Sequence, residues 1–271
     1  ALGNGALASN TTASNNTAVG FSALLANTTG TQNNGFGVNA LTANTGGNYN
    51  VSMGTNSLMS NTTGGRNTAI GTNAMLVNTT GDNNVAIGAY ALDAANAPRN
   101  VAIGAYAMSS STSAEQNVAI GQAALQLLTT GNNNTVVGQT AAYSLTTGTD
   151  NVAVGRAALY SATTGTENIA IGLNAGYYCT SNQNTFVGGE GCGDAVTTGG
   201  ENTFIGAYSG TRCTTGQGNT AVGSDSGSYT TTGSFNTTCG KDAGTSPEIG
   251  GGGNNSCLGY QANVSGSGAN N

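Results

Sequence analysis

Carboxylate side chains are the first candidates for chemistry in this chain, and they are few. The sequence of 271 residues holds eleven Asp and Glu, of which Glu190, Asp194 and Glu201 form the only cluster. Such a cluster could bind a cation weakly, or act on a glycosidic bond as paired acids do in polysaccharide-cleaving enzymes. The other acids mostly occur singly in turn-like segments, and a solvated turn is also the simpler interpretation of this cluster.

The residues that most catalytic and metal sites require are missing. The chain has no His, which excludes a His-based triad and a His metal ligand. Its glycine-rich stretches contain neither a phosphate-loop Gly-Lys-Ser/Thr nor the Gly-Gly-x-Gly-x-Asp calcium repeat. We therefore predict a protein that is not an enzyme and has no catalytic, metal-binding or cofactor-binding residue.

Tyrosines recur at a regular spacing. Tyr143, Tyr160 and Tyr177 follow one another at one constant interval, and Tyr90 and Tyr106 form a second pair. Aromatic rings in one column could bind sugars by stacking. Tyrosines that pack on one another along a repeat structure are the simpler interpretation.

Five cysteines lie in the last third of the chain: Cys179, Cys192, Cys213, Cys239 and Cys257. Cys179 and Cys213 fall two repeats apart, at about 9.6 Å if repeats stack like strands, which is too far for a disulfide. We expect small buried hydrophobic residues, with bridges between chains as the alternative. The odd count excludes complete pairing within one chain.

A strict repeat positions all of these side chains. Glycine recurs from Gly3 to Gly259, and eleven of the fifteen intervals are 17, the others being 16, 16, 18 and 19. An asparagine stands four residues before each of these glycines from Gly20 onward. A strict short period predicts a solenoid, in which each coil buries its apolar face against its neighbours. The fold prediction is an all-β parallel β-solenoid, a β-roll, of about sixteen coils.

Each Asn-to-Gly pentapeptide predicts one strand. Asn16-Thr17-Ala18-Val19-Gly20 is the type unit, with an apolar residue before the glycine and usually Ala one place earlier. Because neighbouring side chains in a strand alternate in direction, this pattern predicts a strand buried on both faces. A repeat of this length fits two short strands facing each other across a thin interior, joined by Thr-Thr-Gly turns.

The asparagines and glycines are the structural residues that we single out. The asparagines predict either a ladder of stacked amides or a row of residues that merely favour turns. The glycines predict a positive φ or a close approach of backbone. The rows through the middle of the chain are Asn67, Asn84, Asn100, Asn117, Asn134 and Asn151, with Gly71, Gly88, Gly104, Gly121, Gly138 and Gly155.

The sequence predicts one repeat domain over residues 1–271 with a change of pattern near residue 172. Before it, the fourth residue after the glycine is mostly Leu or Met; from 173 to 271 it is mostly Gly or Cys. Losing Leu from a stacked row should narrow the coil. The run Gly250 to Gly253 predicts a flexible loop or a weakened coil.

Composition restricts the partners. A net charge of −6 with five scattered Lys and Arg argues against nucleic acid and against an anionic membrane surface. Low charge and a surface rich in Thr, Asn, Ser and Gly suggest an extracellular fibre, on a cell or a virion, and a piece of a longer protein. Since Ala makes one coil thin, we expect copies to associate through the Ala/Val strand faces or the Ala-Leu segment after the glycine.

The unit Asn-Val-Ala-Ile-Gly-x-x-Ala, at 84–91, 100–107 and 117–124, resembles the head repeats of YadA-like trimeric autotransporter adhesins. Similar Asn-Thr-x-x-Gly repeats occur in phage tail fibres. The resemblance covers nearly the whole chain and implies a left-handed parallel β-roll, a homotrimer and attachment to a surface receptor, such as a glycan.

The function predicted is a non-enzymatic adhesive or structural fibre segment. Two other classes stay open. Columns of Thr-Thr pairs, as at Thr28-Thr29, Thr62-Thr63 and Thr79-Thr80, could match an ice lattice. A polysaccharide-acting β-helix would need an acidic cleft around Glu190, Asp194 and Glu201.

Overall fold

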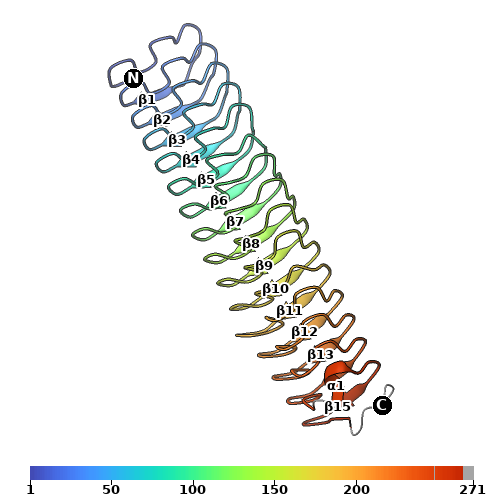
Figure 1. Ribbon diagram of the computed structural model, residues 1–271. Helices are drawn as coiled ribbons and strands as arrows, with labels where there is room; N and C mark the ends of the chain where they lie inside the picture. Colours follow the sequence, from blue (N-terminus) through green and yellow to red (C-terminus); the bar gives the residue numbers. More distant parts are fainter. Residues whose placement is uncertain (247, 265–271) are drawn as a thin grey trace. The chain divides into compact units, whose positions relative to one another are not determined.

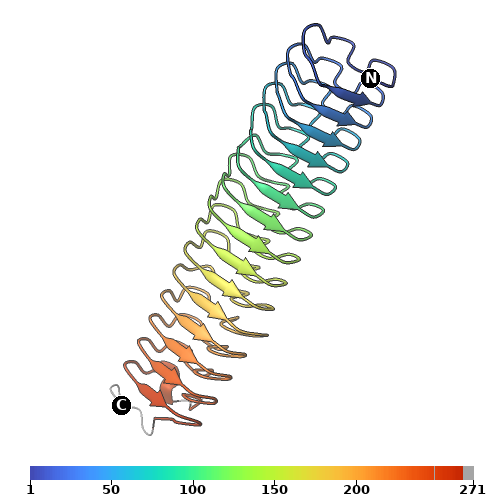
Figure 2. The same cartoon turned by 180° about the vertical axis from the view of Figure 1, so that it is seen from behind.

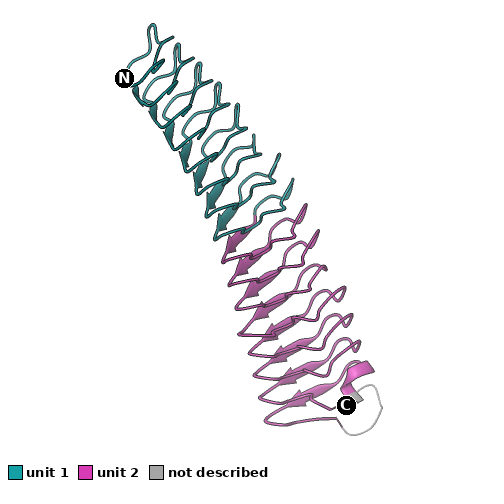
Figure 3. Cartoon of the chain, turned by 60° about the vertical axis from the view of Figure 1, so that its left-hand side comes forward, with its two compact units in different colours: residues 1–133 teal, residues 134–271 magenta. Residues whose placement is uncertain are grey.

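The computed structural model describes residues 1–246 and 248–264 and divides the chain into two compact units, residues 1–133 and 134–271 (Figure 3). Each unit is a stack of coils. The boundary between the units differs from the change of sequence pattern near residue 172.

One three-residue strand per coil forms a parallel sheet along one wall of each unit (Figures 1 and 2). Unit 1 holds β1 (Thr17–Val19), β2 (Asn34–Phe36), β3 (Val51–Met53), β4 (Thr68–Ile70), β5 (Val85–Ile87), β6 (Val101–Ile103) and β7 (Val118–Ile120). Unit 2 holds β8 (Thr135–Val137), β9 (Val152–Val154), β10 (Ile169–Ile171), β11 (Thr185–Val187), β12 (Thr203–Ile205), β13 (Thr220–Val222), β14 (Thr237–Cys239), the helix α1 (Glu248–Gly251) and β15 (Ser256–Leu258).

The predicted all-β parallel β-solenoid is confirmed, with about 14 turns rather than sixteen. Strands pair in register: Thr68 lies opposite Val85, and Val85 opposite Val101, one residue short of the usual step. The intervals of 18 and 19 keep the same register, as Thr185 opposite Thr203 and Thr237 opposite Ser256 show. Extra or missing residues are therefore absorbed in the turns.

The prediction of two strands per coil is wrong, because the wall opposite the sheet consists of turns. There the second and fourth residues after the glycine have positive φ, as in Ser22 (56°) and Leu24 (52°). The N–H of Leu24 donates to Ala40 O in the next coil at 2.9 Å, while Ala23 N–H donates to Gly20 O in its own coil. This alternation links neighbouring coils without extended backbone.

The core of each coil lies between the middle strand residue and the fourth residue after the glycine. In the Leu-type coils these are a small and a large side chain, such as the fully buried Ala69 and Met75. In two of the later coils the sizes are exchanged: Phe186 and Phe204 are buried in the middle of β11 and β12, whereas Ala221 and Thr238 hold this place in β13 and β14. A Cβ placed on Gly193 would collide with the Phe186 ring, so this ring fills the space that Leu occupies elsewhere. In these two coils the volume expected to be lost after residue 172 is thus supplied from the strand.

The strands are buried on one face only, which corrects the prediction of burial on both. The middle residue points inward, whereas its two neighbours lie on the outer face and are half-buried or exposed. Ile120 and Ile171 are 36% and 40% exposed. Ala fits the inner position because the opposite wall brings a larger side chain against it.

The glycine run at 250–253 is ordered differently from the predicted loop. Gly250 and Gly251 belong to α1, whose Ile249 is fully buried with Ala243, Cys257 and Val264. The inserted residues of the longest repeat thus supply a core side chain.

Candidate functional site

The asparagine four residues before each glycine forms a hydrogen-bonded ladder within each unit. The side-chain Oδ1 accepts the backbone N–H of the asparagine one coil further on, at 2.9 to 3.1 Å. The Nδ2 of Asn67 donates to Gly81 O at 2.8 Å, and Asn134 and Asn151 bond in the same way to Gly148 and Gly165. Asn84, Asn100 and Asn117 are likewise fully buried. These amides bind coil to coil and leave no group for a ligand.

A second asparagine ladder runs through unit 1, seven residues after the glycines. Asn27, Asn44, Asn61 and Asn78 each donate Nδ2 to Oδ1 of the asparagine one coil earlier, at 2.8 to 2.9 Å. Ala95 occupies this position in the following coil, and Oδ1 of Asn78 is buried without a hydrogen-bond partner. In the sequence this second ladder is marked only by regularly spaced Asn-Thr-Thr segments. A chain so rich in Asn and Thr also contains such segments by composition alone.

The repeat glycines hold the coils together by close approach. Gly71, Gly88, Gly104, Gly121, Gly138 and Gly155 have φ of 130° to 146°. A Cβ on Gly71 would lie 2.6 Å from Gly88 O, closer than any side chain permits. These glycines allow the backbones of neighbouring coils to come into direct contact.

The predicted tyrosine column is a stack. Ring centroids of Tyr143 and Tyr160 are 5.3 Å apart, and those of Tyr160 and Tyr177 are 5.0 Å apart, with nearly parallel planes. Tyr90 and Tyr106 stack in unit 1 at 5.2 Å. Rings stacked at this spacing cover one another's faces, so a sugar cannot stack on the inner members of a column. Tyr178 stands at 71° to Tyr177 and is 55% exposed.

The five cysteines are free thiols, and Cys179, Cys192, Cys213 and Cys257 are buried. Burial raises the pKa of Cys192 and that of Cys213 to about 12, and it also raises the pKa of Cys179. Cys239 differs, because it lies on the outer face of the sheet and is partly accessible.

The acidic residues do not form a metal site in the part of the chain that the structure describes, where no three His, Cys, Asp or Glu side chains group suitably. Oδ1 of Asp194 accepts from Thr211 Oγ1 at 3.0 Å, and Tyr208 OH donates to Glu190 at 3.5 Å. Partial burial raises the pKa of Asp194. Glu201 lies instead in the turn before β12.

The threonines that begin the Thr-Thr pairs at 28–29 and 62–63, and Thr45 at the same position of the coil between them, use their hydroxyl groups in hydrogen bonds between coils. Thr28, Thr45 and Thr62 each donate Oγ1–H to the carbonyl of the equivalent residue in the next coil, at 3.0 to 3.2 Å. Unit 2 has the same bonds, as from Thr197 to Thr214. An ice lattice would have to be matched by the remaining hydroxyl lone pairs and by the second threonines.

Rows of mainly apolar side chains run along the outer face of the sheet. In β3 to β7 these side chains are half-buried, except for Met53 and Ile120, which are 45% and 36% exposed. In these strands the face consists of two in-register rows: Val51, Thr68, Val85, Val101 and Val118, and Met53, Ile70, Ile87, Ile103 and Ile120. We call these ten residues the outer apolar face. Charged residues are absent from all fifteen strand segments. The Ala-Leu segments expected at a contact between chains are buried within each coil instead, as are the strand alanines.

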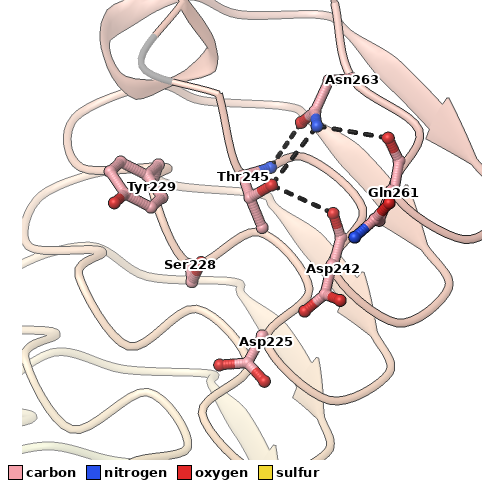
Figure 4. Close-up of a pocket in the computed structure, with 7 residues that line it drawn as sticks. All are labelled: Asp225, Ser228, Tyr229, Asp242, Thr245, Gln261 and Asn263. Carbon is pink, nitrogen blue, oxygen red and sulfur yellow. Dashed lines mark hydrogen bonds between the residues drawn. The ribbon is translucent and has the colours of Figure 1, made fainter.

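The described residues line several surface cavities, and one of them has a volume of about 570 Å³. It lies in unit 2 and is lined by Asp225, Ser228, Tyr229, Asp242, Thr245, Gln261 and Asn263 (Figure 4). A cavity of about 210 Å³ in unit 1 is lined by Asn48, Tyr49, Thr63, Gly65, Arg66 and Asp82, and one of about 200 Å³ in unit 2 by Asn174, Tyr177, Tyr178 and Asp194.

No protein-family model matches this chain, and no curated protein or solved structure matches it either. In the described residues, no helix has the length and apolar character needed to span a membrane. The geometry above therefore carries the functional argument alone.

Proposed function

We propose that this chain is a non-enzymatic segment of an extracellular fibre, on a cell surface or a virion, that assembles as a homotrimer of left-handed coils. Its coils propagate a shape and present surface residues to a receptor. The outer apolar face is the observation that supports this proposal.

The outer apolar face has the character of a contact between chains. The ten residues of this face lie on the five strands β3 to β7, which extend over roughly 19 Å at strand spacing. With a width of about 10 Å the face covers roughly 200 Å², so the regular rows and the lack of charge support the contact rather than the area alone. The strands carry no charged residue, as is typical of the core of a contact between proteins.

Packing within each chain leaves this face as the surface available for assembly. The strand alanines and the Leu row fill the chain's own core. The Val and Ile rows gain burial only from another molecule, and a second copy offers a face of matching repeat. Three copies around one axis would cover the rows of each.

Mass measurement tests the assembly. One chain has a mass of 26.4 kDa, and we expect light scattering after size exclusion to give three times this value for the intact chain. The double variant Ile87→Lys, Ile103→Lys places charges on neighbouring strands and should give the monomer mass. Val77→Lys is the control, because Val77 is 49% exposed but lies on another wall.

A stable monomer of the intact chain would refute the trimer. Thermal hysteresis of that monomer would favour the ice-binding alternative, and hydrolysis of a polysaccharide would overturn the non-enzymatic role. Circular dichroism of each variant shows whether the fold is retained.

A further inference from the structure

The cavity of about 570 Å³ is built from three successive coils of unit 2. Asp225, Asp242 and Gln261 each stand two residues after their repeat glycines, so they form one column. Ser228, Tyr229 and Thr245 lie further along the same turn wall. All seven lining side chains carry hydrogen-bonding atoms, and none is aliphatic (Figure 4). The volume of about 570 Å³ lies within the usual range of small-molecule sites.

One wall of this cavity is fixed by internal hydrogen bonds. Oδ1 of Asn263 accepts from the N–H of Thr245 at 2.6 Å and from that of Ser246 at 2.9 Å. Nδ2 of Asn263 donates to Thr245 Oγ1 and to Gln261 O, both at 3.3 Å, and Thr245 Oγ1 donates to Asp242 O at 3.1 Å (Figure 4). Such a network holds the wall in place before a ligand arrives, which lowers the entropic cost of binding.

The charges around the cavity are balanced. Lys241 Nζ lies 2.8 Å from Asp242 Oδ2, and the Arg212 guanidinium lies 4.2 Å from the centroid of the Tyr229 ring. Asp225 Oδ2 accepts from Ser224 Oγ at 2.9 Å. Two carboxylates disfavour an anion. A divalent cation would want more carboxylates than the two present. A neutral, hydroxyl-rich ligand fits this combination.

We propose that this cavity binds a neutral sugar unit of a glycan. The inference rests on the proposed role as a surface-binding fibre, because it names the class of molecule bound. Sugar hydroxyls would donate to Asp225 and Asp242 and accept from the amide of Gln261. Hydrogen bonds to charged acceptors are the stronger kind. Arg212 covers one face of the Tyr229 ring, so this residue would contact the sugar through the part of its side chain that lines the cavity.

Two positions of this lining also line a smaller cavity three coils earlier. Asn174 and Tyr178 hold the positions of Asp225 and Tyr229, and they line the cavity of about 200 Å³ with Tyr177 and Asp194. Three coils correspond to about 14 Å. Two polar sites at that distance favour a linear glycan as ligand, because one chain of sugars could occupy both and gain from multivalency.

The test uses the full chain and a panel of neutral hexose and N-acetylhexosamine tetrasaccharides, measured by isothermal titration calorimetry. Calcium chloride alone and inorganic phosphate are separate arms. Asp225→Asn and Asp242→Asn remove one charge each and suit the backbone, since Asn tolerates the φ of 56° and 58° at these positions. Asp82→Asn, which changes the same charge at the unit 1 cavity, is the control.

We expect at least one tetrasaccharide to bind, each cavity variant to weaken it about 10-fold, and Asp82→Asn to leave it unchanged. Should an aspartate variant lose its circular dichroism spectrum, Gln261→Asn shortens an exposed side chain instead and should weaken binding too. Binding of none of the sugars, binding of calcium alone, binding of phosphate alone, or equal sugar affinity in the cavity variants would overturn the proposal. One chain forms the whole cavity, so the mass of the same sample separates failure of this inference from failure of the trimer.

Discussion

At the scale of single residues, the asparagine side-chain amides form hydrogen bonds from coil to coil, as backbone amides do from strand to strand in a sheet. Each buried asparagine offers one acceptor and two donors, and successive coils place these where the neighbours need them. The stability that each asparagine contributes depends on its position in the ladder. A buried polar atom without a partner costs more free energy than a formed hydrogen bond contributes. Asn78, at the end of the second ladder, shows the unpaired state.

The second ladder predicts an asymmetry between neighbouring asparagines. Asn61→Ala leaves Oδ1 of Asn44 unpaired and removes one of the two acceptors of Asn78 Nδ2, the other being Gly81 O. Asn78→Ala also unpairs Oδ1 of Asn61, but it removes an Oδ1 that is already without a partner. We expect Asn61→Ala to lower the free energy of unfolding by about 1–3 kcal/mol more than Asn78→Ala. Urea denaturation measures the difference. Equal losses of unfolding free energy in the two variants would mean that the hydrogen bonds of neighbouring asparagines do not depend on one another.

Asp93 predicts a pH dependence. Desolvation raises the pKa of this carboxyl above its ordinary value of 3.8, and its Oδ1 is buried without a hydrogen-bond partner. A raised pKa in the folded state means that the ionised form is the less well accommodated one. Stability contributed by the protonated form is therefore complete below pH 3.8 and is lost as pH rises through the folded pKa.

Replacement of Asp93 by Asn should remove this loss. We expect Asp93→Asn to unfold at the same urea concentration as the parent at pH 3, and at a higher one at pH 7. Comparison within the pair cancels the titration of the other acids. An advantage of Asn that is equally large at both pH values would contradict the electrostatic cause.

At the scale of the coil, the wall of turns places bulky residues in the left-handed region. The fourth residue after the glycine has positive φ whether it is Leu58 (48°) or Gly210 (60°). For Leu this conformation costs about 1–2 kcal/mol, which burial of the side chain must offset. Later coils avoid the cost with glycine, and two of them fill the space with Phe186 or Phe204. The chain therefore contains two ways of filling the core of a coil, one with a Leu in the left-handed region and one with a glycine there and a Phe in the strand.

Two glycines test how far the coil depends on close approach. Gly71→Ala would place a Cβ 2.6 Å from Gly88 O at a φ of 133°, and should destabilise the protein by about 3 kcal/mol. Gly46→Ala meets only Thr29 Oγ1, at 3.5 Å, and should change stability by less than about 0.5 kcal/mol. Thermal melts of the two variants compare them, and similar melting temperatures would contradict the close-approach argument.

The strand wall could be predicted from sequence, and the turn wall could not. Periodic Asn and Gly mark each strand because their hydrogen bonds and close contacts repeat in every coil. Leu24 and Met75 gave no sign of positive φ, since their intrinsic preference opposes it and only packing between coils imposes it. A strand of three residues also leaves open which face is inward. Ala18 is inside because Leu24 and its equivalents fill the thin core, and the Val and Ile rows remain outside.

At the scale of the whole molecule, low charge and partly exposed apolar rows belong together. The chain has 6% charged residues, and the outer face carries none in its strands. Such a surface is best accommodated in an assembly, where the Val and Ile rows gain the burial that one chain cannot give. Cys239 reports on this assembly because it occupies the same outer row in β14.

Thiol labelling at pH 8 follows from this placement. In the assembled protein we expect Cys239 to react slowly with iodoacetamide, because copies cover its face. Ile205→Lys, whose parent side chain is 40% exposed in the same row, should open the contact and allow one thiol per chain to react quickly. Cys192 and Cys213 should stay unmodified in both, since burial raises their pKa to about 12 and almost no thiolate exists at pH 8. Thr215→Lys adds the same charge on an exposed turn and should leave Cys239 protected. Fast reaction of Cys239 in the parent protein would place this face in solvent and argue against the trimer contact in unit 2.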